Sequence, residues 1–166
     1  MTSVVRLREL LERLATADVE FILVGGLAVN AWGHVRGTQD LDIVPNPDPE
    51  NLDRLASVLE SVGGRVETPS GRLAASAIPV FLRAGDRTLV ATEIGPVDIL
   101  QGLPQIPSHA QLTADAVDVD LDGLVVRVCS LESLLEMKRA SDRPQDRADL
   151  EALEAARAVG EDEPEG

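Results

Sequence analysis

Apolar residues at the start of the chain recur with the spacing of one helix face. Leucines at positions 7, 10, 11 and 14 fall on this face and predict an amphipathic helix from Val4 to about Thr16. The continuous apolar run Phe21-Ile22-Leu23-Val24 predicts a short buried strand that ends at Gly25-Gly26. A second helix is expected to leave this glycine turn directly, from Leu27 to about Trp32.

The next segment changes from helical spacing to alternation. Asp40-Leu41-Asp42-Ile43-Val44 alternates polar and apolar residues, which is typical of a strand, and Pro45 and Pro47 end it. Asp48 followed by Pro49 predicts the start of a helix, because proline is favoured at the first helical position. This helix is expected to run to about Val62 and to end at Gly63-Gly64.

The second half of the chain contains shorter apolar runs that glycine and proline separate. Four of these runs are strand candidates: 65–67, 80–83, 88–92 and 97–100. Asp122-Gly123 is a strong signal for a two-residue hairpin turn between strands at 117–121 and 124–128. Ser130 is the expected cap of a helix to about Ser141, and a last helix is expected after Pro144, to about Val159.

The order of these elements bears on the fold class. Helices and strands are mixed without regular βαβ alternation, so an α+β fold is favoured over a doubly wound parallel sheet. No internal repeat or linker divides the chain, and 166 residues suit one domain with a real core. We expect a single domain over residues 1–160 and an acidic, disordered tail over residues 161–166.

Composition narrows the function. The formal net charge of −14 repels phosphate backbones, so it favours a small-molecule substrate or a basic protein partner over extended nucleic acid. Aromatic residues make up 2% of the chain, which leaves few platforms for stacking unpaired bases, and Trp32 is expected in the core. Cys129 is the single cysteine, and neither a secretory nor a membrane-spanning segment is evident. We therefore expect a cytoplasmic protein without a membrane partner.

Two glycines and two aspartates form the clearest chemical signal. Gly25 and Gly26 lack Cβ atoms and open a helix, so their backbone N–H groups are expected to approach a phosphate closely. Asp40 and Asp42 lie on one face of a strand, about 7 Å apart at Cα, and their oxygens are suited to Mg²⁺. Taken alone, the glycines indicate a simple turn and the aspartates a solvated strand face. Their combination at short range favours a nucleotide and metal site.

The residues around this signal resemble a known superfamily. The segment Gly25-Gly26-Leu27-Ala28, Gly33, Arg36-Gly37-Thr38 and Asp40-Leu41-Asp42-Ile43 resembles the signature of the DNA polymerase β-like nucleotidyltransferases. Its Gly-Gly-x-Ala start and Arg-x-Thr-x-Asp-Leu-Asp ending are similar to the small bacterial branch, with AbiEii-like toxins, MNT-type antitoxins and antibiotic nucleotidyltransferases. Many relatives have Gly-Ser where this chain has Gly25-Gly26. No serine hydroxyl is therefore available at this place to hold a phosphate. The resemblance implies a nucleotidyltransferase fold, with a small mixed sheet flanked by helices and with C-terminal helices.

The resemblance also implies a third acid on a neighbouring strand, which completes a triad for two metal ions. Asp98, in Gly95-Pro96-Val97-Asp98-Ile99-Leu100, is similar to this motif and has apolar neighbours typical of a strand. Glu93 is the competing candidate, but a Gly-Pro break separates it from that strand and indicates a solvated strand end. The remaining alternative is that Asp98 is an exposed strand acid without a role.

A lysine interrupts the apolar stripe of the helix after Ser130. Leucines at 131, 134 and 135 define the stripe, and the next position on it is Lys138, which is expected either to face an anion or to extend its ammonium into water. Residues 138–150 resemble a lysine-to-aspartate motif of the AbiEii-like proteins. That motif implies Lys138 near nucleotide phosphates and Asp146 or Asp149 supporting the site. An ion-pair network among these charges is the alternative.

The loop before the acids carries two further candidates. The family pattern implies that Arg36 contacts phosphate or braces the carboxylates, and Thr38 belongs to the same nucleotide-binding segment. His34, His109 and Cys129 lack the spacing of metal ligands, which argues against a zinc site.

The expected function is a metal-dependent nucleotidyltransferase, which transfers a nucleoside monophosphate from an NTP to an acceptor hydroxyl, with Mg²⁺ or alternatively Mn²⁺ as cofactor. The expected roles are as follows: metal binding and catalysis by Asp40, Asp42 and Asp98, nucleotide binding by Gly25, Gly26, Arg36, Thr38 and Lys138, and support by Asp146. The acceptor stays open among a small molecule, a tRNA and a protein. The alternative is a non-catalytic or regulatory component of a toxin–antitoxin-type pair with a cognate protein partner, and a homodimer is compatible with both.

Overall fold

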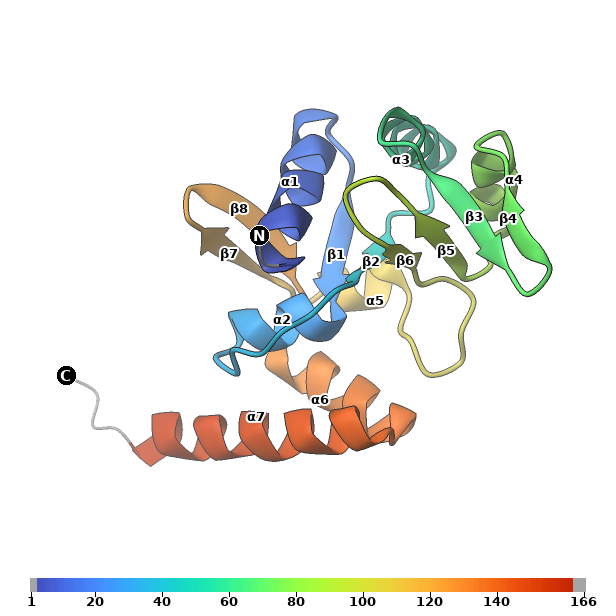
Figure 1. Ribbon diagram of the computed structural model, residues 1–166. Coiled ribbons are helices and arrows are strands. Elements are labelled where there is room, and N and C mark those ends of the chain that lie inside the picture. The colour runs from blue at the N-terminus through green and yellow to red at the C-terminus, as the bar shows by residue number, and fades with distance from the viewer. Residues whose placement is uncertain (1–2, 163–166) are drawn as a thin grey trace.

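The computed structural model describes residues 3–162 and is built around one eight-stranded sheet with helices packed around it (Figure 1). The helices are α1 (Ser3–Thr16), α2 (Gly25–Ala31), α3 (Pro49–Ser61), α4 (Ala77–Ala84), α5 (His109–Thr113), α6 (Leu131–Ser141) and α7 (Pro144–Asp162). The strands are β1 (Phe21–Val24), β2 (Leu41–Pro45), β3 (Arg65–Thr68), β4 (Gly71–Leu73), β5 (Thr88–Ala91), β6 (Val97–Ile99), β7 (Val117–Leu121) and β8 (Leu124–Val128). The predicted α+β class, with a mixed sheet and C-terminal helices, is confirmed.

The strand order brings distant parts of the chain together at the centre of the sheet. The order is β4-β3-β5-β6-β2-β1-β8-β7, so β2 lies between β1 and β6. β2 runs antiparallel to β1 and parallel to β6. The parallel register places Asp42 directly beside Asp98, although 56 positions separate them along the chain. The hairpin β7–β8 forms around Asp122-Gly123 as predicted, and β8 pairs with β1.

The core is almost entirely aliphatic. The four leucines of the predicted α1 stripe are all buried, which confirms that helix face. They join the inward side chains of the central strands, such as Leu23, Leu41 and Ile99, in one cluster. Trp32 is half-buried against this cluster, and its Nε1 donates to the carbonyl oxygen of Cys129 at 2.9 Å. Trp32 is therefore a packing residue, as predicted.

Two C-terminal helices lie across one end of the sheet. Figure 1 shows α6 and the long α7, in orange and red, beneath α2, and α6 packs against both α7 and α2. Ser130 caps α6 as predicted, since its side-chain oxygen accepts from the backbone N–H of Ser133 at 3.0 Å. Because α6 packs against α2, the pair α6–α7 faces the glycine turn at which α2 begins.

One predicted strand is wrong. Residues 80–83 belong to α4, in which Ile78 and Leu82 are fully buried at the i, i+4 spacing while Val80 is 66% exposed. A strand would place Val80 and Leu82 on the same face, so the burial pattern excludes it. Helix α4 ends at Gly85, which has a φ of 75° that suits glycine.

Other differences concern short elements and boundaries. Strand β4 and helix α5 were not expected, and α2 begins two residues earlier than predicted, at Gly25. Asp40 lies just before β2 rather than within it. Helix α7 continues through Asp162, and residues 163–166 of the predicted tail lie outside the described residues. Within residues 3–162, none of the helices has the length and apolar character needed to cross a membrane.

Candidate active site

The residues predicted to form the site line one open cleft of about 1040 Å³. It lies between the glycine turn, the ends of β2 and β6, and the helix pair α6–α7. All nine candidates are among its lining residues: Gly25, Gly26, Arg36, Thr38, Asp40, Asp42, Asp98, Lys138 and Asp146. The structure therefore brings together three segments, near residues 25–42, 98 and 138–146, that the sequence could only associate by resemblance.

Asp42 and Asp98 stand side by side in the cleft, on paired strands. Burial, together with the negative charges of Asp98 and Asp40, raises the pKa of Asp42 to about 7, while Lys138 and Arg143 act in the opposite direction. The surroundings of Asp42 thus disfavour its ionised form, and its carboxyl group holds a proton up to about neutral pH. Asp40 is exposed at the mouth of the cleft, just before the strand.

The glycine turn packs directly against these groups. Gly25 has a φ of +68°, and a Cβ there would lie 2.0 Å from Oδ2 of Asp42. A Cβ on Gly26 would lie 2.5 Å from Oγ1 of Thr38. Both positions therefore require glycine, one to let the backbone approach the carboxylate and the other to let the loop before β2 approach α2.

Asp98 is paired with an arginine that the sequence did not indicate. Arg87 Nε and Nη2 donate to the two carboxylate oxygens of Asp98, at 3.0 and 2.7 Å. Arg87 precedes β5, which pairs with β6, and it also lines the cleft. Its pKa is raised mainly by the hydrogen bond to Asp98. No local sequence motif marks Arg87, because its proximity to Asp98 follows from the pairing of β5 with β6.

Lys138 is buried and holds two carboxylates of α7. Its Nζ lies 3.1 Å from Oδ1 of Asp146 and 3.0 Å from Oδ2 of Asp149. The lysine side chain is 8% exposed and both aspartates are almost fully buried, so the ammonium does not extend into water. The predicted stripe position of Lys138 is confirmed, and the ion-pair network forms beside the cleft.

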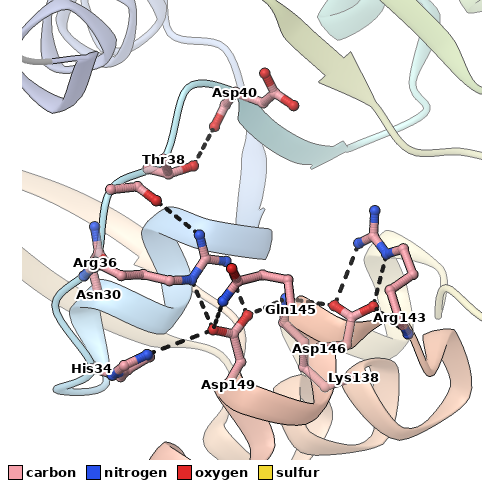
Figure 2. Close-up of polar contacts among 11 residues, drawn as sticks. Asn30, His34, Arg36, Thr38, Asp40, Lys138, Arg143, Gln145, Asp146 and Asp149 are labelled. Atoms are coloured by element: carbon pink, nitrogen blue, oxygen red, sulfur yellow. Dashed lines mark hydrogen bonds and ion pairs between the residues drawn. The ribbon is translucent and has the colours of Figure 1, made fainter.

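The network continues to the loop before the acids (Figure 2). Arg36 Nε and Nη2 donate to Asp149 at 2.8 and 3.0 Å, and Gln145 Nε2 donates to the same carboxylate at 2.9 Å. Nε2 of His34 lies 3.7 Å from Oδ1 of Asp149. Of the two roles predicted for Arg36, the structure shows bracing, but of Asp149 rather than of the acids on the strands.

Arg143 completes the network at the mouth of the cleft. Its Nε donates to Oδ2 of Asp146 at 2.8 Å, while its side chain stays 72% exposed (Figure 2). Burial raises the pKa of Asp146, but hydrogen bonds from Arg143, Ser141 and Lys138 outweigh it and hold the pKa below its ordinary value. Arg143 is thus a fourth cation of the cleft, beside Arg36, Arg87 and Lys138, and the sequence indicated it only as part of a motif.

Several other candidates lie away from the cleft. Glu93 is not among the cleft residues and packs against Gly63, where a Cβ would lie 2.8 Å from its Oε1. Cys129 is buried, which raises the pKa of its thiol to about 12. Over residues 3–162, no group of three or more His, Cys, Asp or Glu side chains is arranged to hold a metal ion as it stands. In the cleft itself, Arg87 occupies both oxygens of Asp98.

The sequence and the fold are both similar to nucleotidyltransferases. The model of the family described as "Nucleotidyl transferase of unknown function (DUF2204)" matches residues 3–162. No sequence among the curated proteins matches the chain.

Three solved structures illustrate the likeness of fold. The lincosamide antibiotic adenylyltransferase LnuA, with lincomycin bound, has a TM-score of 0.63 at 16% identity, over 91% of this chain and 96% of that one. The enzyme ANT(2'')-Ia, in complex with adenylyl-2''-tobramycin, has a TM-score of 0.60 at 17% identity, over 96% and 97%. A putative nucleotidyltransferase from Thermotoga maritima has a TM-score of 0.52 at 18% identity, over 93% and 88%.

The raised pKa of Asp42 predicts a stability that falls with rising pH. The folded state retains a proton on Asp42 up to about pH 7, whereas the unfolded chain loses it near pH 4. In chelator, Asp42→Asn should therefore be more stable than wild type by on the order of 2–4 kcal/mol at about pH 8, with the advantage shrinking toward pH 4. Urea denaturation at several pH values measures it. Asp118→Asn is the control, because Asp118 of β7 forms an exposed pair with Arg127 of β8. An Asp42→Asn variant no more stable than wild type at high pH would contradict the expectation.

The lysine network predicts that Asp149 anchors α7 to the rest of the fold. Asp149→Asn leaves Lys138 and Arg36 short of a buried counter-charge, so it should lower the free energy of unfolding by about 3 kcal/mol. Glu154→Gln on the same helix, in an exposed pair with Arg139, should change it by less than about 0.5 kcal/mol. Urea denaturation of both variants tests this, and equal effects would show that the network does not anchor the helix.

Proposed function

This chain belongs to the family of nucleotidyl transferases of unknown function (DUF2204), and we propose that it transfers a nucleoside monophosphate from an NTP to an acceptor hydroxyl in a metal-dependent reaction, with pyrophosphate as the leaving group. The observation that carries the proposal is the convergence of the predicted glycines, acids and lysine in one cleft. At its centre, Asp42 and Asp98 are held in register on two neighbouring strands.

The chemistry of these acids fits a divalent cation. Asp42 has a pKa raised to about 7 by burial and by its acidic neighbours, so a cation beside it would stabilise its ionised form. Carboxylate oxygens are the ligands that Mg²⁺ prefers, and Mn²⁺ accepts the same donors. Asp40, Asp42 and Asp98 would hold the metal, which when bound would polarise the phosphate and activate the acceptor hydroxyl.

The other cleft residues would position the nucleotide. Val24 offers no side-chain cap to α2, and a phosphate bound at this turn would accept from backbone N–H groups at Gly25-Gly26. Lys138 supplies buried positive charge below the acids, and Arg143 presents an exposed guanidinium at the mouth. Arg36 and Thr38 would act indirectly, because Arg36 holds Asp149 and Thr38 packs against Gly26.

The size of the cleft favours two ligands rather than one. At about 1040 Å³ it lies at the upper limit of ~300–1,000 Å³ typical of single-ligand pockets. Its lining contains no aromatic residue, and its larger apolar side chains are Leu100, Leu103, Ile106, Leu134 and Met137. The same fold holds lincomycin in LnuA and adenylyl-2''-tobramycin in ANT(2'')-Ia, which supports a small hydroxyl-bearing acceptor here. A tRNA end and a protein hydroxyl are the other acceptor classes to test.

A non-catalytic role is the second candidate. Arg87 covers both oxygens of Asp98, and if this contact is permanent Asp98 could not hold a metal, which would suit a non-catalytic or regulatory component of a toxin–antitoxin-type pair. The two functions differ in one measurable property, which is metal-dependent binding of an NTP followed by transfer.

Calorimetric titration of ATP, GTP, CTP and UTP, each with Mg²⁺, tests the proposal. At least one NTP should bind wild type, and Asp40→Ala/Asp42→Ala should weaken that binding by more than about tenfold, because the metal ligands are lost. Asp118→Ala is the matched control, since it removes an acid from an exposed pair outside the cleft. Labelled NTP with candidate acceptors then tests transfer. Absence of NTP binding, or equal binding by the double variant, would contradict the enzymatic function.

A further inference from the structure

The cations that line the cleft differ in how firmly they are held. Lys138 is buried between two carboxylates, and Arg36 is fixed by two hydrogen bonds to buried Asp149. Arg87, in contrast, is half-exposed, and its head contacts Asp98. Arg143, the fourth cation, is more exposed and pairs with Asp146, so among these four Arg87 is the one whose partner is a proposed metal ligand.

The backbone that carries Arg87 is fixed even though its head is exposed. The next residue, Thr88, is buried and pairs with Ile99 across β5 and β6. The preceding turn is packed tightly, since a Cβ on Gly102 would lie 2.6 Å from the carbonyl oxygen of Gly85. Movement at this position is therefore confined to the side chain, which has several rotatable bonds and an open cleft in front of it.

Asp98 needs a counter-charge whether or not a metal is bound. It is a buried carboxylate, and a buried charge without a partner is strongly unfavourable. The bidentate contact with Arg87 supplies the counter-charge in this structure. A guanidinium and a divalent cation on the same carboxylate would repel each other, so the two are expected to compete.

On the basis of the proposed function, we infer that Arg87 exchanges partners: it covers Asp98 when the cleft holds no divalent cation, and it binds the nucleotide phosphates when the cation takes its place. The charge on Asp98 then stays balanced in both states. A guanidinium released beside the acids lies where an incoming polyphosphate needs positive charge, and arginine pairs with phosphate through two parallel hydrogen bonds. Metal and nucleotide binding are thereby linked through one side chain.

The exchange predicts opposite effects of one substitution on two affinities. Without nucleotide, Arg87→Ala should bind Mn²⁺ about tenfold more tightly than wild type, because the competing cation is gone. The same variant should bind Mg²⁺–ATP, or the NTP that wild type prefers, about tenfold more weakly, because a phosphate contact is lost. Arg87→Lys keeps the charge but loses the bidentate geometry, so it should recover nucleotide affinity while still binding Mn²⁺ more tightly than wild type.

Calorimetry and the electron paramagnetic resonance signal of free Mn²⁺ measure both affinities without reference to activity. Arg83→Ala is the control, because Arg83 forms an exposed pair with Asp53 outside the cleft. Thermal unfolding confirms that each variant is folded. Opposite shifts in Arg87→Ala alone support the exchange.

Other outcomes overturn the inference in distinct ways. Unchanged or weaker Mn²⁺ binding by Arg87→Ala would make Arg87 a permanent brace of Asp98. Tighter Mn²⁺ binding with unchanged nucleotide affinity would make it a counter-charge that never reaches the phosphates. If wild type binds no NTP at all, the proposed function itself fails, which is a different result from wild-type binding that Arg87→Ala leaves unaltered.

Discussion

The parallel pairing of β2 with β6 holds the carboxylates of Asp42 and Asp98 side by side, at a place where neither is solvated as it would be in water. Backbone hydrogen bonds at the centre of the sheet fix this proximity, so the repulsion cannot relax by separation of the strands. It is expressed instead in the pKa of Asp42, which burial and the neighbouring acids raise. The basic residues of the cleft offset part of this effect, since Lys138 and Arg143 lower the pKa of Asp42 and Arg87 pairs with Asp98.

Arg87 and Lys138 act on the paired acids in different ways. Arg87 contacts one of the paired acids directly. Lys138 does not contact either acid: it is held between Asp146 and Asp149 and acts on Asp42 only through its field. Because Asp149 also holds Arg36, the lysine network joins α6, α7 and the loop before β2 into one unit. The positions of α6 and of the loop before β2 at the cleft therefore depend on α7, although this helix contributes few of the lining side chains.

Features that depend on neighbouring residues in sequence could be predicted. The leucine stripe of α1, the strand at Phe21–Val24 and the hairpin at Asp122-Gly123 each have a local cause, and the structure contains them. The apolar run at 80–83 was misassigned, because a short apolar run fits a buried helix face as well as a strand. The position of Lys138 on the buried stripe also followed from helical periodicity.

Features that depend on strand register could not be predicted in this way. The contact of Arg87 with Asp98 requires the pairing of β5 with β6, which neither segment specifies alone. The same is true of Arg36 and Asp149, which lie 113 positions apart and meet only because α7 crosses beneath α2. The position of Asp98 beside Asp42 was expected from resemblance rather than from the residues, and its physical basis is visible only in the sheet.

The state of Cys129 has a practical consequence for following motion in the cleft. It is the chain's single cysteine, and its buried thiol, with a pKa near 12, is protonated and shielded from thiol reagents at neutral pH. The native protein is therefore not expected to react with maleimide dyes or thiol-specific spin labels. A cysteine introduced at an exposed position, for example at Val35 in the loop before β2, becomes the sole labelling position. The native Cys129 does not have to be replaced. Fluorescence or spin-label spectroscopy can then report on the loop in an otherwise unmodified molecule.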